Sequence, residues 1–239
     1  MKYLFTFLIP SLLFATNQSW QDFENNAYIG GAYSYNNTNT GGFGNVSSSS
    51  PMVDIGATIL MQSNIWANIE GEGNFLSGGA YVSNWYNLTG KVGYSINSNK
   101  WNFIPYGVIG VGNGGVYFSS SNSINYGAGL LSEISINANW LLFADINYQF
   151  QSFSGQINTD FNKNVINNQS TYSINGTPST YQMEFGAKYI TNNGLYISPF
   201  VKYQNYNQTF TQSSGNINYG SVNPNTNQII VGVNFGVVL

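Results

Sequence analysis

Side chains alternate between apolar and polar along much of this chain, and this period of two residues limits the possible folds more than any other feature. Val53, Ile55 and Ile59 share one phase of such a run, while Asp54 and Thr58 lie on the other. Alternation of this kind is typical of β-strands, in which successive side chains point to opposite faces. Beyond the N-terminus, no stretch is apolar for long enough to form a membrane helix. The pattern therefore predicts an all-β fold.

The alternating runs number ten, and turn-forming residues separate them. They cover about 28–36, 52–61, 65–76, 84–96, 101–118, 125–136, 140–150, 180–190, 195–208 and 228–239. The connections at 62–64, 97–100, 137–139 and 191–194 are short, whereas those at 36–51, 151–179 and 211–227 are long and polar. An even number of strands with short turns on one side and long loops on the other is typical of an outer-membrane barrel. Ten strands are expected, eight are the second choice, and the last run is expected to pair with the first.

Charged residues are scarce, and those inside the runs share one phase. They make up 6% of the chain, against roughly 25% in an ordinary soluble domain. Nine of them lie opposite the large apolar side chains of their strands: Asp54, Glu70, Glu72, Lys91, Glu133, Asp145, Glu184, Lys188 and Lys202. A soluble β-sandwich would place its charges in water and would need many more of them. We therefore predict a transmembrane up-and-down antiparallel β-barrel with these nine residues in its lumen and the apolar phase against lipid.

The first residues have the pattern of a secretory signal peptide. Lys2 is basic, Leu4–Phe14 is a short and mostly apolar segment, and Ala15 is a small residue at which cleavage can occur. The apolar segment is shorter than the approximately 20 residues that a transmembrane helix needs. The expected organisation is a cleaved peptide at 1–15 followed by a single barrel domain at 16–239.

Aromatic residues mark the short turns. Trp66, Trp101, Trp140 and Tyr196 each lie at or just after a short turn, where the periplasmic aromatic girdle of a barrel is expected. Trp101 and Trp140 lie on the phase assigned to lipid, whereas Trp66 and Tyr196 lie on the opposite phase.

Three segments resemble successive strands of the small outer-membrane β-barrel family that includes the OmpA-like and OmpX-like barrels. They are Phe103-Ile104-Pro105-Tyr106-Gly107, Tyr126-Gly127-Ala128-Gly129 with Glu133, and Asn139-Trp140-Leu141 with Asp145 and Tyr148. The resemblance implies the outer membrane of a Gram-negative bacterium, lipid as its surroundings, and periplasmic chaperones and the barrel-assembly machinery as partners. It also implies an inward network of acids and bases that closes the lumen.

The sequence departs from this family in two respects. The family usually has eight strands, and its members mostly end in Phe, whereas this chain ends in Leu239. Phe235, Val237 and Leu239 alternate at the C-terminus and are the expected assembly signal.

Most catalytic chemistry is excluded by composition. His, Cys and Arg do not occur, so a Ser-His-Asp triad, a Cys nucleophile and a zinc site of the usual type are impossible. The known enzyme families among outer-membrane barrels depend on a His. Asp160 is the only acid in the outer loops, too few for a calcium cage. We expect no enzyme activity, no metal and no cofactor, and the few basic residues argue against binding to nucleic acid.

Two patterns resemble functional sites but have simpler explanations. Glu70 and Glu72 are roughly 7 Å apart on one strand face, a spacing that could suit a glycosidase pair. A narrow barrel is filled by side chains and leaves no room for a sugar, so a lumenal ion network is favoured. Gly110–Gly115 matches GxGxxG, but the residues that follow continue as strand and loop rather than as a helix.

Three functions fit these observations. The favoured one is a structural barrel with a closed, charged lumen, whose polar outer loops are surface-exposed and available for adhesion, as a surface antigen or for another form of partner recognition. The second is a narrow porin that favours cations, because six lumenal acids face three lysines. The third is a secreted soluble β-sandwich that binds a ligand.

Overall fold

The computed structural model describes residues 20–39, 45–74, 85–113, 120–158, 171–176, 179–207, 210–214, 217–222 and 225–239. The expected signal peptide at 1–15 lies outside these residues, as do Asp160, residues 114–118 of the fifth predicted strand and residues 40–44 of the predicted loop 36–51. Among the described residues, no helix is long and apolar enough to cross a membrane.

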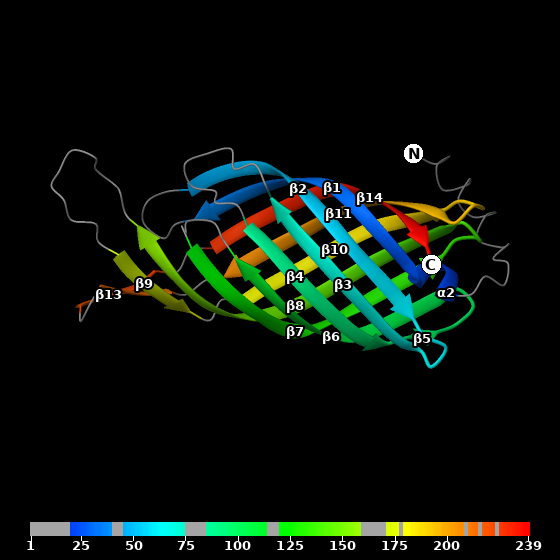
Figure 1. Ribbon diagram of the computed structural model, residues 1–239, viewed down its shortest axis with the longest axis horizontal. Helices are drawn as coiled ribbons and strands as arrows, with labels where there is room; N and C mark the ends of the chain where they lie inside the picture. Colours follow the sequence, from blue (N-terminus) through cyan, green and yellow to red (C-terminus); the bar gives the residue numbers. More distant parts are fainter. Residues whose placement is uncertain are drawn as a thin grey trace, which may run out of the picture.

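Ten antiparallel strands close into a single barrel (Figure 1). Around the ring the order is β10, β11, β14, β1, β2, β3, β4, β6, β7 and β8, and β8 pairs back with β10. The bounds are β1 (Asn26–Asn39), β2 (Asn45–Leu60), β3 (Ile65–Asn74), β4 (Trp85–Tyr94), β6 (Trp101–Asn113), β7 (Ser120–Ser135), β8 (Trp140–Asn158), β10 (Ser179–Ile190), β11 (Leu195–Asn207) and β14 (Asn225–Val238). The prediction of ten strands is confirmed, and the closed ring rules out the β-sandwich.

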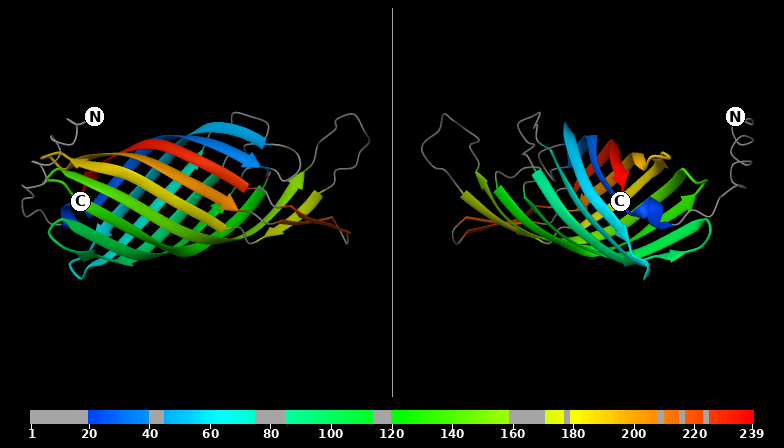
Figure 2. Two further views of the ribbon diagram at one scale, coloured as in Figure 1. Left: turned by 180° about the vertical axis from the view of Figure 1, so that it is seen from behind. Right: turned by 45° about the vertical axis from the view of Figure 1, so that its right-hand side comes forward.

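The first and last strands of the ring meet at a seam. β1 pairs with β14 along its whole length, from Asn26 opposite Val238 to Asn39 opposite Asn225. The pairing predicted between the two ends of the sequence is therefore confirmed. A short helix, α2 (Trp20–Glu24), precedes β1 and lies at the same end of the barrel as the C-terminus (Figures 1 and 2).

Tight turns connect the strands at this end, as predicted. Asn64 and Gly194 close two of them with positive φ angles of 64° and 77°, a conformation that Gly and Asn adopt more readily than other residues. A third turn is held by the Asn137 side chain, which accepts hydrogen bonds from the backbone N–H groups of Asn139 and Trp140. Ile96–Asn97 forms a two-residue strand, β5, beside β6.

At the opposite end the prediction of long loops was wrong, because strands continue through most of the described residues there. β1 and β2 extend as a paired hairpin to Asn39 and Asn45. Three further strands, β9 (Thr171–Gly176), β12 (Phe210–Ser214) and β13 (Ile217–Val222), fall within or next to the predicted loops 151–179 and 211–227. Backbone groups make the ladder bonds, so antiparallel pairing continues into water where apolar alternation has ceased.

These additional strands form a sheet that projects from one end of the barrel (Figures 1 and 2). β9 pairs with the extension of β8, β12 pairs with β9, and β13 pairs with β12. For convenience we call β9, β12 and β13 the outer sheet. It continues the barrel wall outward on one side.

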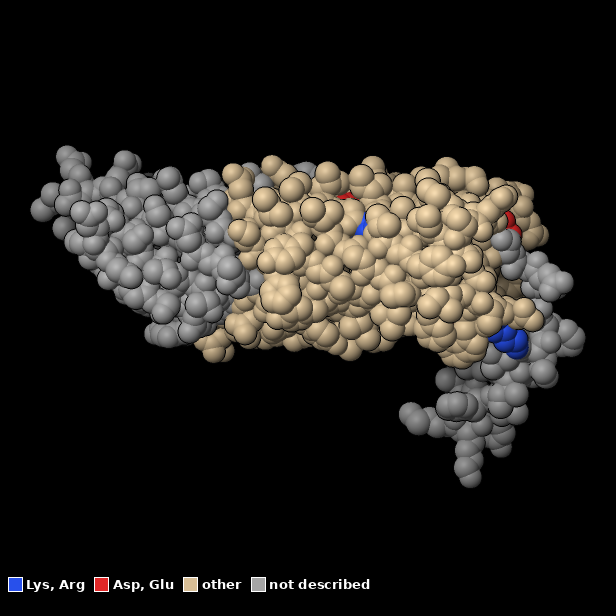
Figure 3. Space-filling model, turned by 90° about the horizontal axis from the view of Figure 1, so that it is seen from below, with Lys and Arg blue, Asp and Glu red and all other residues tan. Residues whose placement is uncertain are grey.

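The outer wall is apolar. Ile55, Val92 and Ile109 point outward and are 57%, 63% and 65% exposed. Figure 3 shows that charged atoms are nearly absent from the visible wall of the barrel. In water such a surface would be a large aggregation hazard, whereas in a bilayer it contacts lipid.

The inner face is more apolar than the sequence predicted. The expectation that large apolar side chains face lipid is wrong for part of β6 and β7, where Ile104, Tyr106 and Leu131 are buried inside the barrel. These residues belong to an inner cluster with Leu60 and Trp66. β6 is apolar on both phases, so its alternation could not distinguish the face in contact with lipid from the face in contact with the lumen.

Two of the four expected girdle residues lie on the lipid side. Trp101 and Trp140 are 48% and 42% exposed on the outer wall, and the Trp140 ring contacts Tyr189 at 4.8 Å between centroids. Trp66 and Tyr196 are buried inside the barrel. Their positions follow the phases read from the sequence.

A charge placed on the outer wall tests the membrane-facing assignment. We expect Ile55→Lys to destabilise the barrel in lipid vesicles by about 2–4 kcal/mol, because Ile55 lies on the apolar outer face of β2 and a lysine within the bilayer loses its hydration. Asn37→Lys, on the exposed face near the outer end of β1, is the control and should change stability by less than about 1 kcal/mol. Urea unfolding in vesicles measures both; equal effects would contradict the assignment.

Candidate functional site

The lumen holds a central ion network that crosses the barrel. Lys202 Nζ lies 3.2 Å from Glu70, 3.3 Å from Glu72 and 3.4 Å from Glu184. Lys91 Nζ lies 3.3 Å from the other oxygen of Glu70 and 3.4 Å from Asp145. Glu70 thus links the two lysines, and groups from β3, β4, β8, β10 and β11 join in one network. We call these six residues the central network.

A second ion cluster lies nearer the turn end and includes a residue that the sequence analysis did not single out. Lys188 Nζ lies 2.5 Å from Glu24 Oε1 and 3.4 Å from Glu133 Oε1. The indole N–H of Trp66 donates to Glu24 Oε2 at 2.7 Å. Glu24 belongs to α2, outside any alternating run, so period-two analysis had no means of finding it.

Helix α2 is held inside the mouth of the barrel by apolar contacts as well as by charge. Phe23 is 2% exposed and packs in a cluster with Leu141, Ile190 and Tyr196. Trp20 donates its indole N–H to the carbonyl of Ser98 at 2.7 Å. α2 therefore fills the turn end of the lumen.

Neutral side chains donate hydrogen bonds to two of the buried acids. The Tyr106 hydroxyl donates to Asp145 Oδ1 at 2.5 Å, and the Asn102 amide donates to Glu133 Oε2 at 2.8 Å. Hydrogen bonds to a carboxylate stabilise its charged form in a place from which water is largely excluded. The acids are thus held by fixed donors as well as by lysines.

Toward the outer end, the lumen is filled by uncharged polar side chains. The Gln204 amide donates to Gln182 at 2.8 Å, Thr38 and Thr226 share a bond of 3.0 Å, and Ser34 bonds to Ser50. These side chains are 8% exposed or less. The interior therefore changes along the barrel axis from α2 and apolar side chains, through ions, to hydroxyls and amides.

The structure brings eight of the nine predicted lumenal residues into ion pairs. Six belong to the central network, and Glu133 and Lys188 belong to the second cluster. Asp54 is on the same inner face and is 6% exposed, but it has no lysine within ion-pair distance among the described residues. The side chains of the expected assembly signal, Phe235, Val237 and Leu239, are exposed on the outer wall.

The two motifs that resembled functional sites have structural roles here. Glu70 and Glu72 both bond to Lys202, which leaves neither of them as a free carboxylate in an open cleft. Gly110 and Gly112 lie within β6, so the glycine-rich segment does not open a helix as a dinucleotide site requires. Among the described residues, no group of three or more acids could hold a metal ion.

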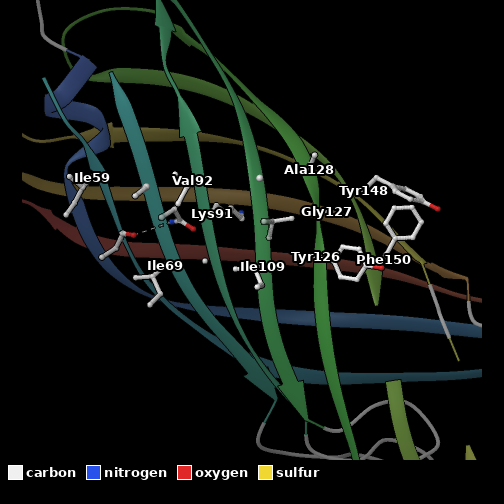
Figure 4. Close-up of a pocket in the computed structure, with 16 residues that line it drawn as sticks. Ile59, Ile69, Lys91, Val92, Ile109, Tyr126, Gly127, Ala128, Tyr148 and Phe150 are labelled. Carbon is white, nitrogen blue, oxygen red and sulfur yellow. Dashed lines mark hydrogen bonds between the residues drawn. The ribbon is translucent and has the colours of Figure 1, made fainter. Parts of the chain in front are cut away.

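A groove hollows the outer wall across β2, β3, β4, β6, β7 and β8. It has a volume of about 820 Å³. Small residues such as Ala67, Gly90 and Gly107 line it. The rings of Tyr126 and Phe150 stand at one side (Figure 4). Because the groove belongs to the apolar outer wall, we expect lipid acyl chains to fill it.

Comparison with known proteins identifies the group to which this architecture belongs. A family described as "Outer membrane protein beta-barrel domain" matches residues 5–148. None of the curated proteins matches the sequence. Among solved structures, the outer membrane protease OmpT from Escherichia coli has a TM-score of 0.60 at 9% identity, over 92% of this chain and 98% of that chain. This similarity concerns the fold alone.

Two further solved structures are similar over most of their length but superpose less closely. Neisserial surface protein A has a TM-score of 0.37 at 9% identity, over 89% of this chain and 97% of that chain. Ail, the attachment invasion locus protein of Yersinia pestis, has a TM-score of 0.33 at 14% identity, over 89% of this chain and 99% of that chain.

Removing Lys91 from the central network should leave Asp145 without a lysine and Glu70 with Lys202 alone. We expect Lys91→Met to destabilise the barrel by about 3–5 kcal/mol, because Glu70 and Asp145 then lie buried beside an apolar side chain. Adding Glu70→Gln and Asp145→Asn to the same chain should recover much of the loss. Unfolding in detergent micelles measures both variants, and a Lys91→Met protein as stable as the wild type would contradict the electrostatic account.

The anchoring of α2 should depend on pH through Glu24. Burial favours the neutral acid, but the Lys188 ammonium and the bonds from Lys188 and Trp66 hold the pKa of Glu24 below its usual value. A depressed folded-state pKa gives stability that is present above the unfolded value of about 4.3 and is lost as the pH falls through the folded value. At neutral pH, chymotrypsin should therefore cut after Phe23 in Glu24→Ala but not in the wild type.

The wild-type protection should persist at about pH 5 and disappear only in stronger acid, where pepsin replaces chymotrypsin because the latter is inactive there. Asp22→Ala removes an exposed acid from the same helix and should remain protected. Cleavage of Asp22→Ala at the rate of Glu24→Ala would show that the helix, rather than the Glu24 ion pair, was disturbed.

Proposed function

The chain belongs to the outer-membrane protein β-barrel family and lies in the bacterial outer membrane, and from this premise we propose that it is a closed structural barrel that presents the outer sheet at the cell surface for adhesion or partner recognition. In this proposal the turn end faces the periplasm and the outer sheet faces outward. Assembly would use Phe235, Val237 and Leu239 as the signal that periplasmic chaperones and the barrel-assembly machinery recognise.

The filling of the lumen is the observation that carries the closed-barrel proposal. The Lys202 and Glu133 side chains are 3% and 0% exposed, and α2 packs in the mouth with Phe23 buried. A barrel of this size has an interior that side chains can fill. An ion would have to separate buried charge pairs in order to pass, which argues against the narrow cation-favouring porin.

The composition of the outer sheet supports the recognition half of the proposal. Residues 171–176, 210–214 and 217–222 contain Ser, Asn, Thr, Gly and Tyr and no charged residue. Tyr supplies contact area at low entropic cost, and small polar residues supply adaptable hydrogen bonds. A simpler role for these strands is to keep the outer surface wet, and the following experiment separates the two roles.

Strand pairing indicates where the outer sheet can be removed cleanly. Phe150 lies opposite Ser179, and Asn207 lies opposite Asn225, so an Asn-Gly turn in place of 151–178 and another in place of 208–224 would close ordinary two-residue hairpins. We expect this double variant to fold, because it shortens only β8 among the ten ring strands, by residues 151–158, and keeps the pairs Phe150–Ser179 and Asn207–Asn225. Migration in gels before and after boiling checks this expectation.

Two further readouts test the function. Bacteria that display the double variant should adhere less to cultured animal cells than bacteria that display the wild type, while a variant with only the 208–224 replacement should show an intermediate loss. In planar bilayers neither the wild type nor the double variant should give conductance steps. Steps from the double variant alone would show that the outer strands close the pore, and steps from both proteins would favour a narrow porin.

A further inference from the structure

Asp54 is a buried acid without a buried base. It lies on the inner face of β2 and is 6% exposed. Each of the other lumenal acids has a lysine within 3.4 Å, whereas no lysine in the described part of the chain lies within 4 Å of Asp54. Burying a carboxylate without a partner is costly, so its environment requires a separate explanation.

The charges that face Asp54 disfavour its ionised form. Glu72 is directly opposite on β3, and the other charged groups that act on Asp54 are Glu70, Glu184 and Lys202. Lys202 already serves three carboxylates of the central network. An ionised Asp54 would therefore face three like charges, and the one lysine near it already pairs with three other carboxylates.

An amide on the far side of the seam contacts Asp54. The Asn234 Nδ2 group on β14 donates to Asp54 Oδ2 at 3.3 Å. The other oxygen of each group, Asp54 Oδ1 and Asn234 Oδ1, is buried and has no hydrogen-bond partner within the described part of the protein. Two acceptors thus lie unsatisfied in side chains that already share one bond, and unsatisfied buried acceptors are rare in native structures.

Gly30 allows the two side chains to meet. On β1, Gly30 is the register partner of both Asp54 and Asn234, so it lies between them. A Cβ atom at this position would lie 1.8 Å from Asn234 Oδ1. The oxygen therefore occupies the space that the Cβ atom of any other residue type would fill.

One proton accounts for both unsatisfied oxygens. A carboxylic acid has one O–H donor and a primary amide has one carbonyl acceptor, so the two groups can exchange a reciprocal pair of hydrogen bonds. A bound calcium ion would need six to eight oxygen ligands, many more than these two. Protonation also removes the charge that Glu72, Glu70 and Glu184 would repel.

We propose that Asp54 is a neutral carboxylic acid that donates its proton to Asn234 Oδ1 while the Asn234 amide donates to Asp54 Oδ2. This acid-amide pair, which we call the seam clasp, joins β2 to β14 across β1. It fastens the three strands that meet where the barrel closes. The seam clasp does not depend on whether the outer sheet binds a partner or on whether the lumen conducts.

Infrared spectroscopy of the folded protein tests the protonation directly. The C=O stretch of a protonated carboxyl group absorbs at a higher infrared frequency than the stretches of a carboxylate. We expect this band at neutral pH in the wild type, its loss in Asp54→Asn, and its retention in Asp145→Asn, where the acid removed is paired with Lys91. A wild-type spectrum with no band that Asp54→Asn removes overturns the proposal, since Asp54 would then be ionised and bridged by water or a cation.

Labelling distinguishes an aspartate proton from a glutamate proton. Wild-type protein grown with aspartate that carries ¹³C in its side-chain carboxyl group should show the protonated-acid band shifted to lower frequency. The chain has four aspartates, so the shifted band is assigned by the loss of its intensity in Asp54→Asn. If no part of the band shifted, the protonated groups would all be glutamates, and the proposal would be overturned.

Exchanging the two side chains tests the pairing itself. Asp54→Ala and Asn234→Ala should each lower the melting temperature in micelles, whereas Asp54→Asn should keep it near the wild-type value because two amides can also bond reciprocally. The exchanged variant Asp54→Asn/Asn234→Asp should recover both the acid band and the wild-type melting temperature. If Asp54→Asn loses as much stability as Asp54→Ala, or if the exchange restores neither property, the seam clasp is wrong.

Discussion

Hydrocarbon offers no hydrogen bonds, and this single constraint governs the structure. Every N–H and C=O group of a membrane-spanning segment must find a partner within the protein, at a cost of several kcal/mol for each one left unpaired. The pairing of β8 with β10 and of β1 with β14 leaves no free edge in the ring. Once the ring is closed, the alternation of the strands places one set of side chains in lipid and encloses the other.

The side chains inside the barrel must find partners for their charges and hydrogen-bonding groups in a narrow lumen. This explains why the lumen contains ion pairs, neutral polar groups and apolar clusters. Three lysines are distributed over six carboxylates in two clusters, and hydroxyl and amide groups occupy the outer part. Apolar clusters such as Met52, Phe200 and Ile230 fill volume that needs no hydrogen bonds. A lumen of ions alone would leave more charge than the few lysines can compensate, and a lumen of apolar residues alone would lose the network that links opposite strands.

The ring itself could be predicted from the sequence because lipid imposes a strict rule on one face of each strand. The ten strands, their tight turns and the pairing of the ends followed from alternation such as that of Val53, Asp54 and Ile55. Outside the hydrocarbon this rule no longer applies, so alternation does not distinguish the extensions of β1 and β2 or the outer sheet from loops. The same rule fails where both faces are apolar, and the inward positions of Ile104 and Tyr106 were missed for that reason.

The sequence indicates which charged residues face the lumen, but not which of them form ion pairs. The inner phase identified the nine charged residues, yet which lysine meets which acid depends on strand stagger across the ring, which no single strand encodes. Glu24 could not be found, because it enters the lumen on a short helix. The relation of Asp54 to Asn234 depends on a residue between them, Gly30, whose role appears only when three strands are in register.

The place of α2 also restricts the route by which the molecule can form. The helix is continuous with β1 and lies within the cylinder, with Glu24 and Phe23 fully enclosed. A cylinder already sealed at the junction of β1 and β14 would have to admit a bulky Trp-containing segment through a narrow opening and then desolvate its carboxylate. It is simpler for the leading segment to settle against the nascent inner surface while the sheet is still an open, curved ribbon, so that the last strand wraps around a core that is already in place.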